Sequence, residues 1–169
     1  MNKEKIAFIP RQYLAVIAVL LAIMMSVLDG TIMNIALPTL AHDFDVTPST
    51  AIWIVNAYQL VITMTLLSFA SLGDIYGYRR IFLIGISIFV GASLACTLST
   101  SFWMLTAARV IQGFGAACVM SVNTALIRLI YPPQILGRGM GVNAMVVAVS
   151  AAAGPSIAGS ILAVSYTHL

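Results

Sequence analysis

Residues 13–37 read YLAVIAVLLAIMMSVLDGTIMNIAL, and Asp29 is the only charged side chain among them. A helix that crosses a membrane needs about 20 mostly apolar residues, and four further stretches come close to that length. The five predicted helices cover approximately residues 13–37, 51–72, 81–98, 102–127 and 140–164. The sequence therefore predicts an all-α integral membrane protein with about five transmembrane helices.

The composition excludes most other classes of protein. Hydrophobic residues make up 61% of the chain and charged residues only 8%, whereas about a quarter of a soluble domain is charged. The Lys and Arg residues are scattered between apolar stretches, so no basic surface indicates a nucleic-acid partner. The sequence shows no nucleophile with a matched base and no paired carboxylates, so nothing in it indicates an enzyme. It also shows no metal-ligand spacing that would indicate a metal site. Cys96 and Cys118 lie in apolar stretches and predict no disulfide.

Short polar or helix-breaking segments separate the predicted helices. They are Pro38, residues 43–48, residues 73–77, residues 99–101 and the pair Pro132-Pro133. Cytoplasmic loops of membrane proteins carry an excess of Lys and Arg. The basic residues that fall on one side of the predicted membrane are Lys3, Lys5, Arg11, Arg79, Arg80, Arg128 and Arg138. We therefore expect a cytoplasmic N-terminus.

An odd number of helices places the end of the sequence on the outer side. We expect residues 1–169 to be the N-terminal part of a larger membrane domain whose C-terminal remainder is missing. The polar tail SYTHL at residues 165–169 fits no pattern of the preceding helices, and we expect that it is not native sequence.

Asp29 and Arg109 are the two charged residues inside the predicted helices. A charge in hydrocarbon costs several kcal/mol unless it is paired or lines a polar cavity. At 1.5 Å per residue, Arg109 lies about 10 Å from the outer start of its helix, a depth comparable with that of Asp29. We therefore expect the two side chains to face each other across a polar cavity. Two simpler explanations remain open, a purely structural ion pair and a carboxylate that extends to the outer interface.

Two sequence motifs surround these charges. Residues 28–38 (LDGTIMNIALP) match the pattern L-D-x-T-x-x-N-x-A-L-P, and residues 105–117 (LTAARVIQGFGAA) match L-x-x-x-R-x-x-Q-G-x-G-A-A. Both resemble motifs of the major facilitator superfamily, specifically its drug:proton antiporter branch with fourteen helices. In that family the intramembrane arginine is associated with proton coupling, a role that the resemblance assigns to Asp29 and Arg109.

The second predicted helix opens with residues 53–60 (WIVNAYQL), which are similar to the W-x-x-x-x-Y-x-L stretch of the same branch. Trp53 is explained equally well as an anchor at the outer membrane interface. The candidate residues of a translocation path are Asn34, Tyr58, Gln59 and Gln112. The alternative explanation is that these polar side chains form structural hydrogen bonds to a neighbouring helix and do not contact a substrate.

Residues 73–80 (GDIYGYRR) resemble the G-x-L-A-D-R-x-G-R-R-x-x-L loop between the second and third helices of the superfamily. The resemblance implies a conformational-switch loop formed by Asp74, Gly77, Arg79 and Arg80. The pattern is incomplete, because Ala70, Ile75 and Tyr78 replace its leading Gly, its first Arg and a basic residue. The two arginines are also explained by membrane topology alone.

The fifth predicted helix resembles the G-x8-G-x3-G-P-x2-G-G pattern of antiporters. The matching residues are Gly141, Ser150, Gly154, Pro155 and Gly159, with Ser150 and Ala158 in place of two glycines. The small residues at 150, 154 and 158 recur at a spacing of four, so they predict one helix face that another backbone approaches closely. A packing seam with a proline kink would explain the same residues without transport.

The resemblance implies a proton-coupled antiporter that exports drugs or other amphipathic small molecules. It would use the proton motive force and no other cofactor, and no nucleotide-binding G-x4-G-K-[ST] loop occurs in the sequence. The implied partners are the lipid bilayer, protons and a lipophilic, often cationic substrate, in a bacterial inner or plasma membrane. The alternatives are a proton-coupled uptake symporter for a nutrient or metabolite and a membrane scaffold that transports nothing. These 169 residues alone are expected to be inactive.

Overall fold

The computed structural model describes the backbone of residues 4–167 and the side chains of residues 14–159. Its elements are α1 (Glu4–Asp43), α2 (Pro48–Tyr76), α3 (Tyr78–Thr97), α4 (Phe102–Ile130), the short 3-10 helix η1 (Pro133–Ile135) and α5 (Leu136–Thr167). Five of these helices are long and apolar enough to cross a membrane. The predicted all-α membrane architecture is therefore confirmed over the described residues.

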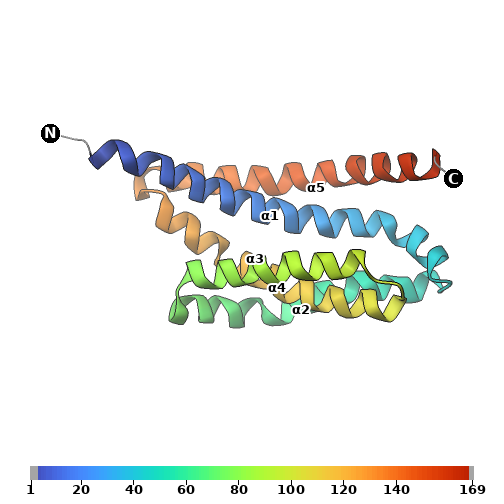
Figure 1. The fold of residues 1–169 in the computed structure, drawn as a ribbon. Coiled ribbons are helices and arrows are strands. Elements are labelled where there is room, and N and C mark those ends of the chain that lie inside the picture. The colour runs from blue at the N-terminus through green and yellow to red at the C-terminus, as the bar shows by residue number, and fades with distance from the viewer. Residues whose placement is uncertain (1–3, 168–169) are drawn as a thin grey trace.

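The helices form two layers. α1 and α5 lie side by side in one layer, while α2, α3 and α4 form the other (Figure 1). The last part of α4 leaves its own layer and rises toward the start of α5 (Figure 1). The contacts of α1 with α2 and α4 join the two layers.

Successive helices run in opposite directions, so the connections alternate between the two ends of the bundle. The start of α1, the turn between α2 and α3 and the connection between α4 and α5 share one end (Figure 1). The basic residues of this end are Arg79, Arg80, Arg128 and Arg138. Their common location agrees with the predicted cytoplasmic side. The other basic residues in that prediction, Lys3, Lys5 and Arg11, lie outside the described side chains.

The predicted break at Pro38 is wrong, because α1 continues through this residue to Asp43. A proline inside a helix lacks the N–H that would bond to the carbonyl four residues earlier. Membrane helices tolerate this loss because the other backbone groups have no water to bond with and therefore keep their hydrogen bonds within the helix.

The predicted loop at residues 73–77 is also shorter than expected. α2 continues to Tyr76 and α3 begins at Tyr78, so only Gly77 separates them. Gly77 has a φ of 93°, a conformation that glycine adopts without the steric penalty of a side chain. A single residue therefore reverses the chain between two membrane helices.

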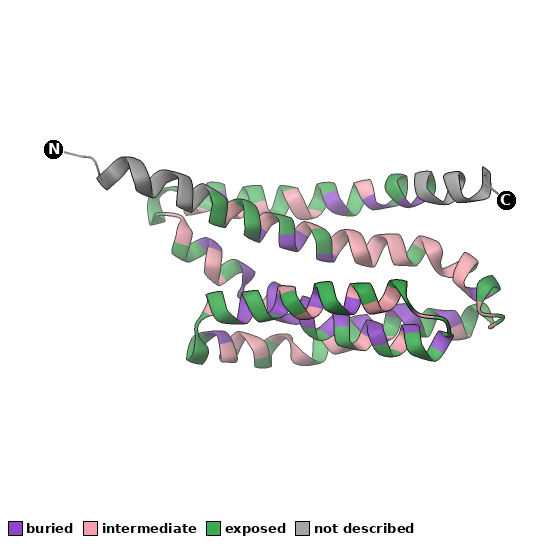
Figure 2. Ribbon diagram, in the orientation of Figure 1, coloured by how far each residue is buried: buried purple, intermediate pink, exposed green. Residues whose placement is uncertain are grey.

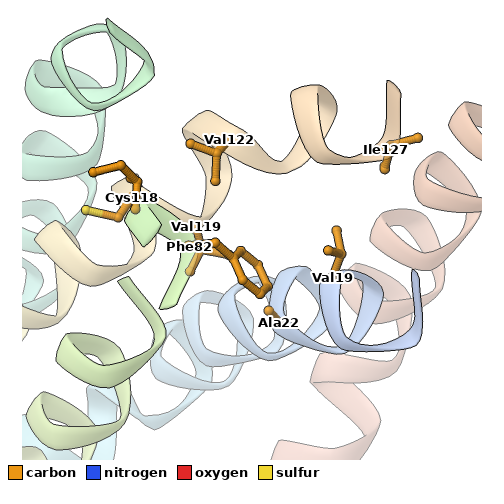
Figure 3. Close-up of a cluster of buried hydrophobic side chains, with 8 residues drawn as sticks. Val19, Ala22, Phe82, Cys118, Val119, Val122 and Ile127 are labelled. Atoms are coloured by element: carbon orange, nitrogen blue, oxygen red, sulfur yellow. The ribbon is translucent and has the colours of Figure 1, made fainter. Parts of the chain in front are cut away.

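Close contact between α3 and α4 builds the centre of the second layer. A Cβ atom at Gly115 would lie 2.5 Å from the backbone nitrogen of Phe89 and 2.8 Å from the carbonyl oxygen of Gly85. The adjacent apolar cluster joins three helices. It consists of Ile81 and the residues labelled in Figure 3, which are Val19, Ala22, Phe82, Cys118, Val119, Val122 and Ile127. Small residues thus let α3 and α4 approach each other, and larger ones attach α1 to both.

α4 is the most buried of the five helices (Figure 2). The surface of the bundle exposes large apolar side chains, including Met64 and Leu67 on α2 and Leu14 on α1. Such surfaces are unfavourable in water and suit a lipid environment. We therefore expect α4 to hold the buried residues of a functional site.

We predict that Gly115→Ala destabilises the bundle by about 1–3 kcal/mol, because the new methyl group meets backbone atoms that cannot move independently. The measurement is unfolding of the protein in detergent micelles, followed by circular dichroism. Gly91→Ala on α3 is the matched control, because a Cβ atom there has no neighbour within 4 Å. This control should leave stability unchanged or raise it by up to about 1 kcal/mol. Equal effects of the two substitutions would contradict the close contact.

Candidate functional site

Arg109 is a fully buried cation in the middle of the bundle. Its side chain projects from α4 with no exposed surface, and its Nη1 atom donates a hydrogen bond to Oδ2 of Asp29 on α1 over 2.6 Å. The Asp29 side chain remains 22% exposed. The sequence analysis expected these two residues to face each other across a polar cavity. In the structure they are in direct contact, and this contact joins the two layers.

Gln112, one helical turn after Arg109, connects the partners of this ion pair. Its Oε1 atom accepts a hydrogen bond from Nη1 of Arg109 over 2.6 Å, and its Nε2 atom donates to Oδ1 of Asp29 over 3.0 Å. The thiol of Cys96 on α3 lies 3.6 Å from the same Oε1 atom. Both carboxylate oxygens of Asp29 therefore have a donor, as a buried charge requires.

Tyr58 of α2 covers the arginine from another side. The centre of its ring lies 4.2 Å from Cζ of Arg109, close enough for a cation–π interaction. Its hydroxyl group lies 3.5 Å from the carbonyl oxygen of Ser26, one turn before Asp29. Tyr58 thus contacts both the cation on α4 and the helix that supplies the anion.

The network leaves two nitrogens of Arg109 without a partner. Nε and Nη2 are buried and form no hydrogen bond within the described part of the chain. A guanidinium group stays protonated in proteins, so Arg109 can stabilise a charge but cannot exchange a proton. Asp29 is the carboxylate of the network, and part of its surface is exposed.

Two of the four residues predicted for a translocation path do not reach this network. Asn34 is exposed, and its amide donates to the carbonyl oxygen of Gly30 within α1. Gln59 is exposed on α2, next to the buried Tyr58. Tyr58 and Gln112 are the two that the structure brings to Asp29 and Arg109.

At the opposite end of α2, Asp74 accepts a hydrogen bond from the hydroxyl of Tyr78. Arg79 and Arg80 are exposed, and neither forms an ion pair with any side chain that the structure describes. Tyr78, which departs from the family pattern, therefore supplies the local partner of Asp74. The two arginines remain free to interact with other groups.

On α5, the small residues meet α1 as their spacing predicted. Ser150, Gly154 and Ala158 are buried, and a Cβ atom at Gly154 would lie 2.0 Å from Oγ1 of Thr31. Pro155 lies inside the continuous helix. The matching glycines at 141 and 159 have open space around them, so they are not part of this contact.

One buried polar pair was missed by the sequence analysis. Nδ2 of Asn123 on α4 donates to Oδ1 of Asn143 on α5 over 3.0 Å, and Oδ1 of Asn123 is buried without a partner among the described residues. Ser26 and Cys96 were also missed as neighbours of the site. The intramembrane position of both asparagines was the available signal, because buried amides in membrane helices commonly bond across helices.

The family model described as Major Facilitator Superfamily matches residues 19–168. The "Uncharacterized transporter YebQ" of Escherichia coli (strain K12) is 58% identical over 93% of this chain and 34% of the relative. The "Riboflavin transporter RibZ" of Clostridioides difficile (strain 630) is 36% identical over 90% of the chain and 33% of the relative. The "Multidrug resistance protein Stp" of Mycobacterium tuberculosis (strain CDC 1551 / Oshkosh) is 37% identical over 88% and 28%. The chain thus spans about a third of the length of these relatives.

We predict that Asp29→Asn lowers the free energy of unfolding by about 3–5 kcal/mol, because it leaves the buried charge of Arg109 uncompensated. The double variant Asp29→Asn with Arg109→Gln should lose less than the sum of the two single changes. A coupling energy above about 1 kcal/mol in a double-mutant cycle, measured by unfolding in detergent, is the expected result. Strictly additive losses would mean that the two charges do not stabilise each other.

Proposed function

Because the chain belongs to the major facilitator superfamily, we propose that it contributes the N-terminal helices of a proton-coupled antiporter that exports amphipathic small molecules. The observation that carries the proposal is the network of Asp29, Arg109 and Gln112 between the two layers. A scaffold protein has no use for a charged network inside the membrane, since each charge costs free energy to bury.

In this proposal Asp29 is the group that exchanges the proton. When Asp29 is ionised, Arg109 holds it and α1 is tied to α4. When Asp29 takes up a proton, its negative charge disappears, and Arg109 keeps only Gln112 and the Tyr58 ring as close partners. The weaker tie allows the layers to shift, and loss of the proton restores it. Proton entry and substrate exit are coupled because both change the strength of the ion pair between Asp29 and Arg109.

The other motif residues have roles around that step. Gly154 lets α5 stay in contact with α1, so we expect the two helices to move as one unit. Gly77 and Asp74 form the tight cytoplasmic turn, while the exposed Arg79 and Arg80 are placed to pair with acidic groups of the remaining part of the transporter. Asn34 and Gln59 lie outside the network, and we expect them to contact substrate rather than the proton.

The names of two further relatives support export. One is the "Tetracenomycin C resistance and export protein" of Streptomyces glaucescens, 36% identical over 88% of this chain. Another is the "Drug efflux pump JefA" of Mycobacterium tuberculosis, 38% identical over 89%. The substrate of the proposed exporter is a lipophilic compound, often a cation, and no cofactor beyond the proton motive force is needed.

Uptake of a metabolite is the second candidate. The relative named as a riboflavin transporter favours it. The same network could couple proton entry to substrate entry, because the ion pair of Asp29 and Arg109 does not determine the direction in which substrate moves. The distinction must come from the direction in which substrate moves under a gradient.

The test uses a full-length transporter that contains this segment, reconstituted in vesicles with an imposed pH gradient and ethidium as the probe. We expect transport of ethidium against its concentration gradient, driven by protons moving the opposite way. Asp29→Asn should abolish the dependence on the gradient, because an amide cannot exchange a proton at neutral pH.

Asp45→Asn is the matched control. It makes the same chemical change at an exposed position outside the bundle, where the φ of 49° also suits asparagine. This variant should transport like the wild type. Undiminished gradient-driven efflux in Asp29→Asn would exclude the proposed role of Asp29. Gradient-driven riboflavin accumulation in the direction of proton entry, without ethidium efflux, would favour the uptake candidate.

A further inference from the structure

A groove at the cytoplasmic end of the second layer belongs to neither the ion-pair network nor the α1–α5 contact. It has a volume of about 330 Å³ and lies between the start of α3 and the last three turns of α4. Its lining residues are Tyr78, Ser121, Thr124, Ala125, Arg128 and Leu129. One side chain of this lining is cationic, three carry hydroxyl groups and two are apolar.

The charges around the groove favour an anion. Arg128 is exposed, and among the described side chains no carboxylate lies within ion-pair distance of it. Arg79 and Arg80 follow the groove residue Tyr78 in the first turn of α3. The nearest acidic residue along the chain is Asp74, and the Tyr78 hydroxyl already occupies one of its oxygens. Arg128 lines the groove and has no acidic partner among the described side chains, so it gives the groove a positive potential.

The start of α3 adds to this potential. Gly77 precedes the helix and provides no side chain to cap it, and the first turn contains no acidic residue. The free N–H groups at a helix start attract negative charge. An anion bound near this helix start would therefore be stabilised by the helix dipole.

The apolar part of the groove identifies the source of the anion. Leu129 is 70% exposed and lies on the same groove wall as Ala125. A hydrated phosphate ion gains nothing from such a surface, whereas the acyl chain of a lipid packs on it. The groove also lies at the end of the bundle where the positive-inside rule places the cytoplasmic leaflet, which is rich in anionic lipids.

We propose that this groove binds one anionic phospholipid, with the phosphate at Arg128 and Thr124 and an acyl chain along Ala125 and Leu129. The guanidinium group supplies a charge-assisted hydrogen bond to a phosphate oxygen, and the hydroxyl of Thr124 supplies a second donor. This site does not depend on which solute is transported or on the role of Asp29.

The test measures lipid retention by native mass spectrometry on the full-length transporter in a neutral detergent. Phosphatidylglycerol is the anionic probe, phosphatidylcholine the zwitterionic one and inorganic phosphate the lipid-free anion. We expect phosphatidylglycerol to be retained in preference to phosphatidylcholine. Arg128→Gln should weaken its binding roughly fivefold, the effect of losing one basic residue near an anionic headgroup.

Arg138→Gln is the matched control, because Arg138 is exposed at the same end of the bundle but does not line the groove. It should retain phosphatidylglycerol like the wild type. Thr124→Val is a second, nearly isosteric variant that keeps every charge, and it should weaken binding about threefold through one lost hydrogen bond. Circular dichroism of each variant verifies that the fold is intact.

Three results would overturn the proposal. Equal losses in Arg128→Gln and Arg138→Gln would show that diffuse charge, and not the groove, attracts the lipid. Equal retention of phosphatidylcholine would show that the headgroup charge is irrelevant. Displacement of phosphatidylglycerol by millimolar inorganic phosphate would show a site for a free anion rather than for a lipid.

Discussion

The burial of Arg109 is the constraint on which the rest of the structure depends. Its guanidinium group cannot lose its charge, so a residue with no exposed surface must bring an anion and several hydrogen-bond acceptors to it. Asp29 and Gln112 meet this requirement at Nη1, and the face of Tyr58 covers the guanidinium group from another side, while Nε and Nη2 have no partner among the described residues. The position of α1 against α4 therefore follows from electrostatics as much as from apolar packing.

The small residues of α4 make this arrangement possible. Gly113 lies against α2, where a Cβ atom would be in tight contact with Tyr58 and Val61, and Gly115 lies against the backbone of α3, where a Cβ atom would collide. Because both neighbours approach so closely, they surround Arg109 and exclude lipid and water from it. In hydrocarbon there is little hydrophobic force between helices, so close packing of this kind has to supply the cohesion.

The sequence predicted the helices and the Asp29–Arg109 contact because both depend on distances along a helix axis. It could not separate Tyr58 from Gln59, since that choice depends on which way α2 is rotated, and the packing of α4 decides it. Pro38 and residues 73–76 were misjudged for different reasons. Proline is tolerated inside membrane helices, so Pro38 does not end α1. Residues 73–76 stay helical because Gly77, with its φ of 93°, reverses the chain alone. To predict the pair of Asn123 and Asn143, one must know how α4 and α5 are aligned along each other, and the sequence of either helix alone does not give this alignment.

Two of the polar contacts between the layers, the one at Arg109 and the one at Asn123, differ in one physical property. The tie at Arg109 contains a titratable carboxylate, whereas the tie at Asn123 contains only amides. They are separated along α4 by about 21 Å at 1.5 Å per residue. The first contact is therefore an attraction between two opposite charges, whereas the second is a hydrogen bond between neutral groups.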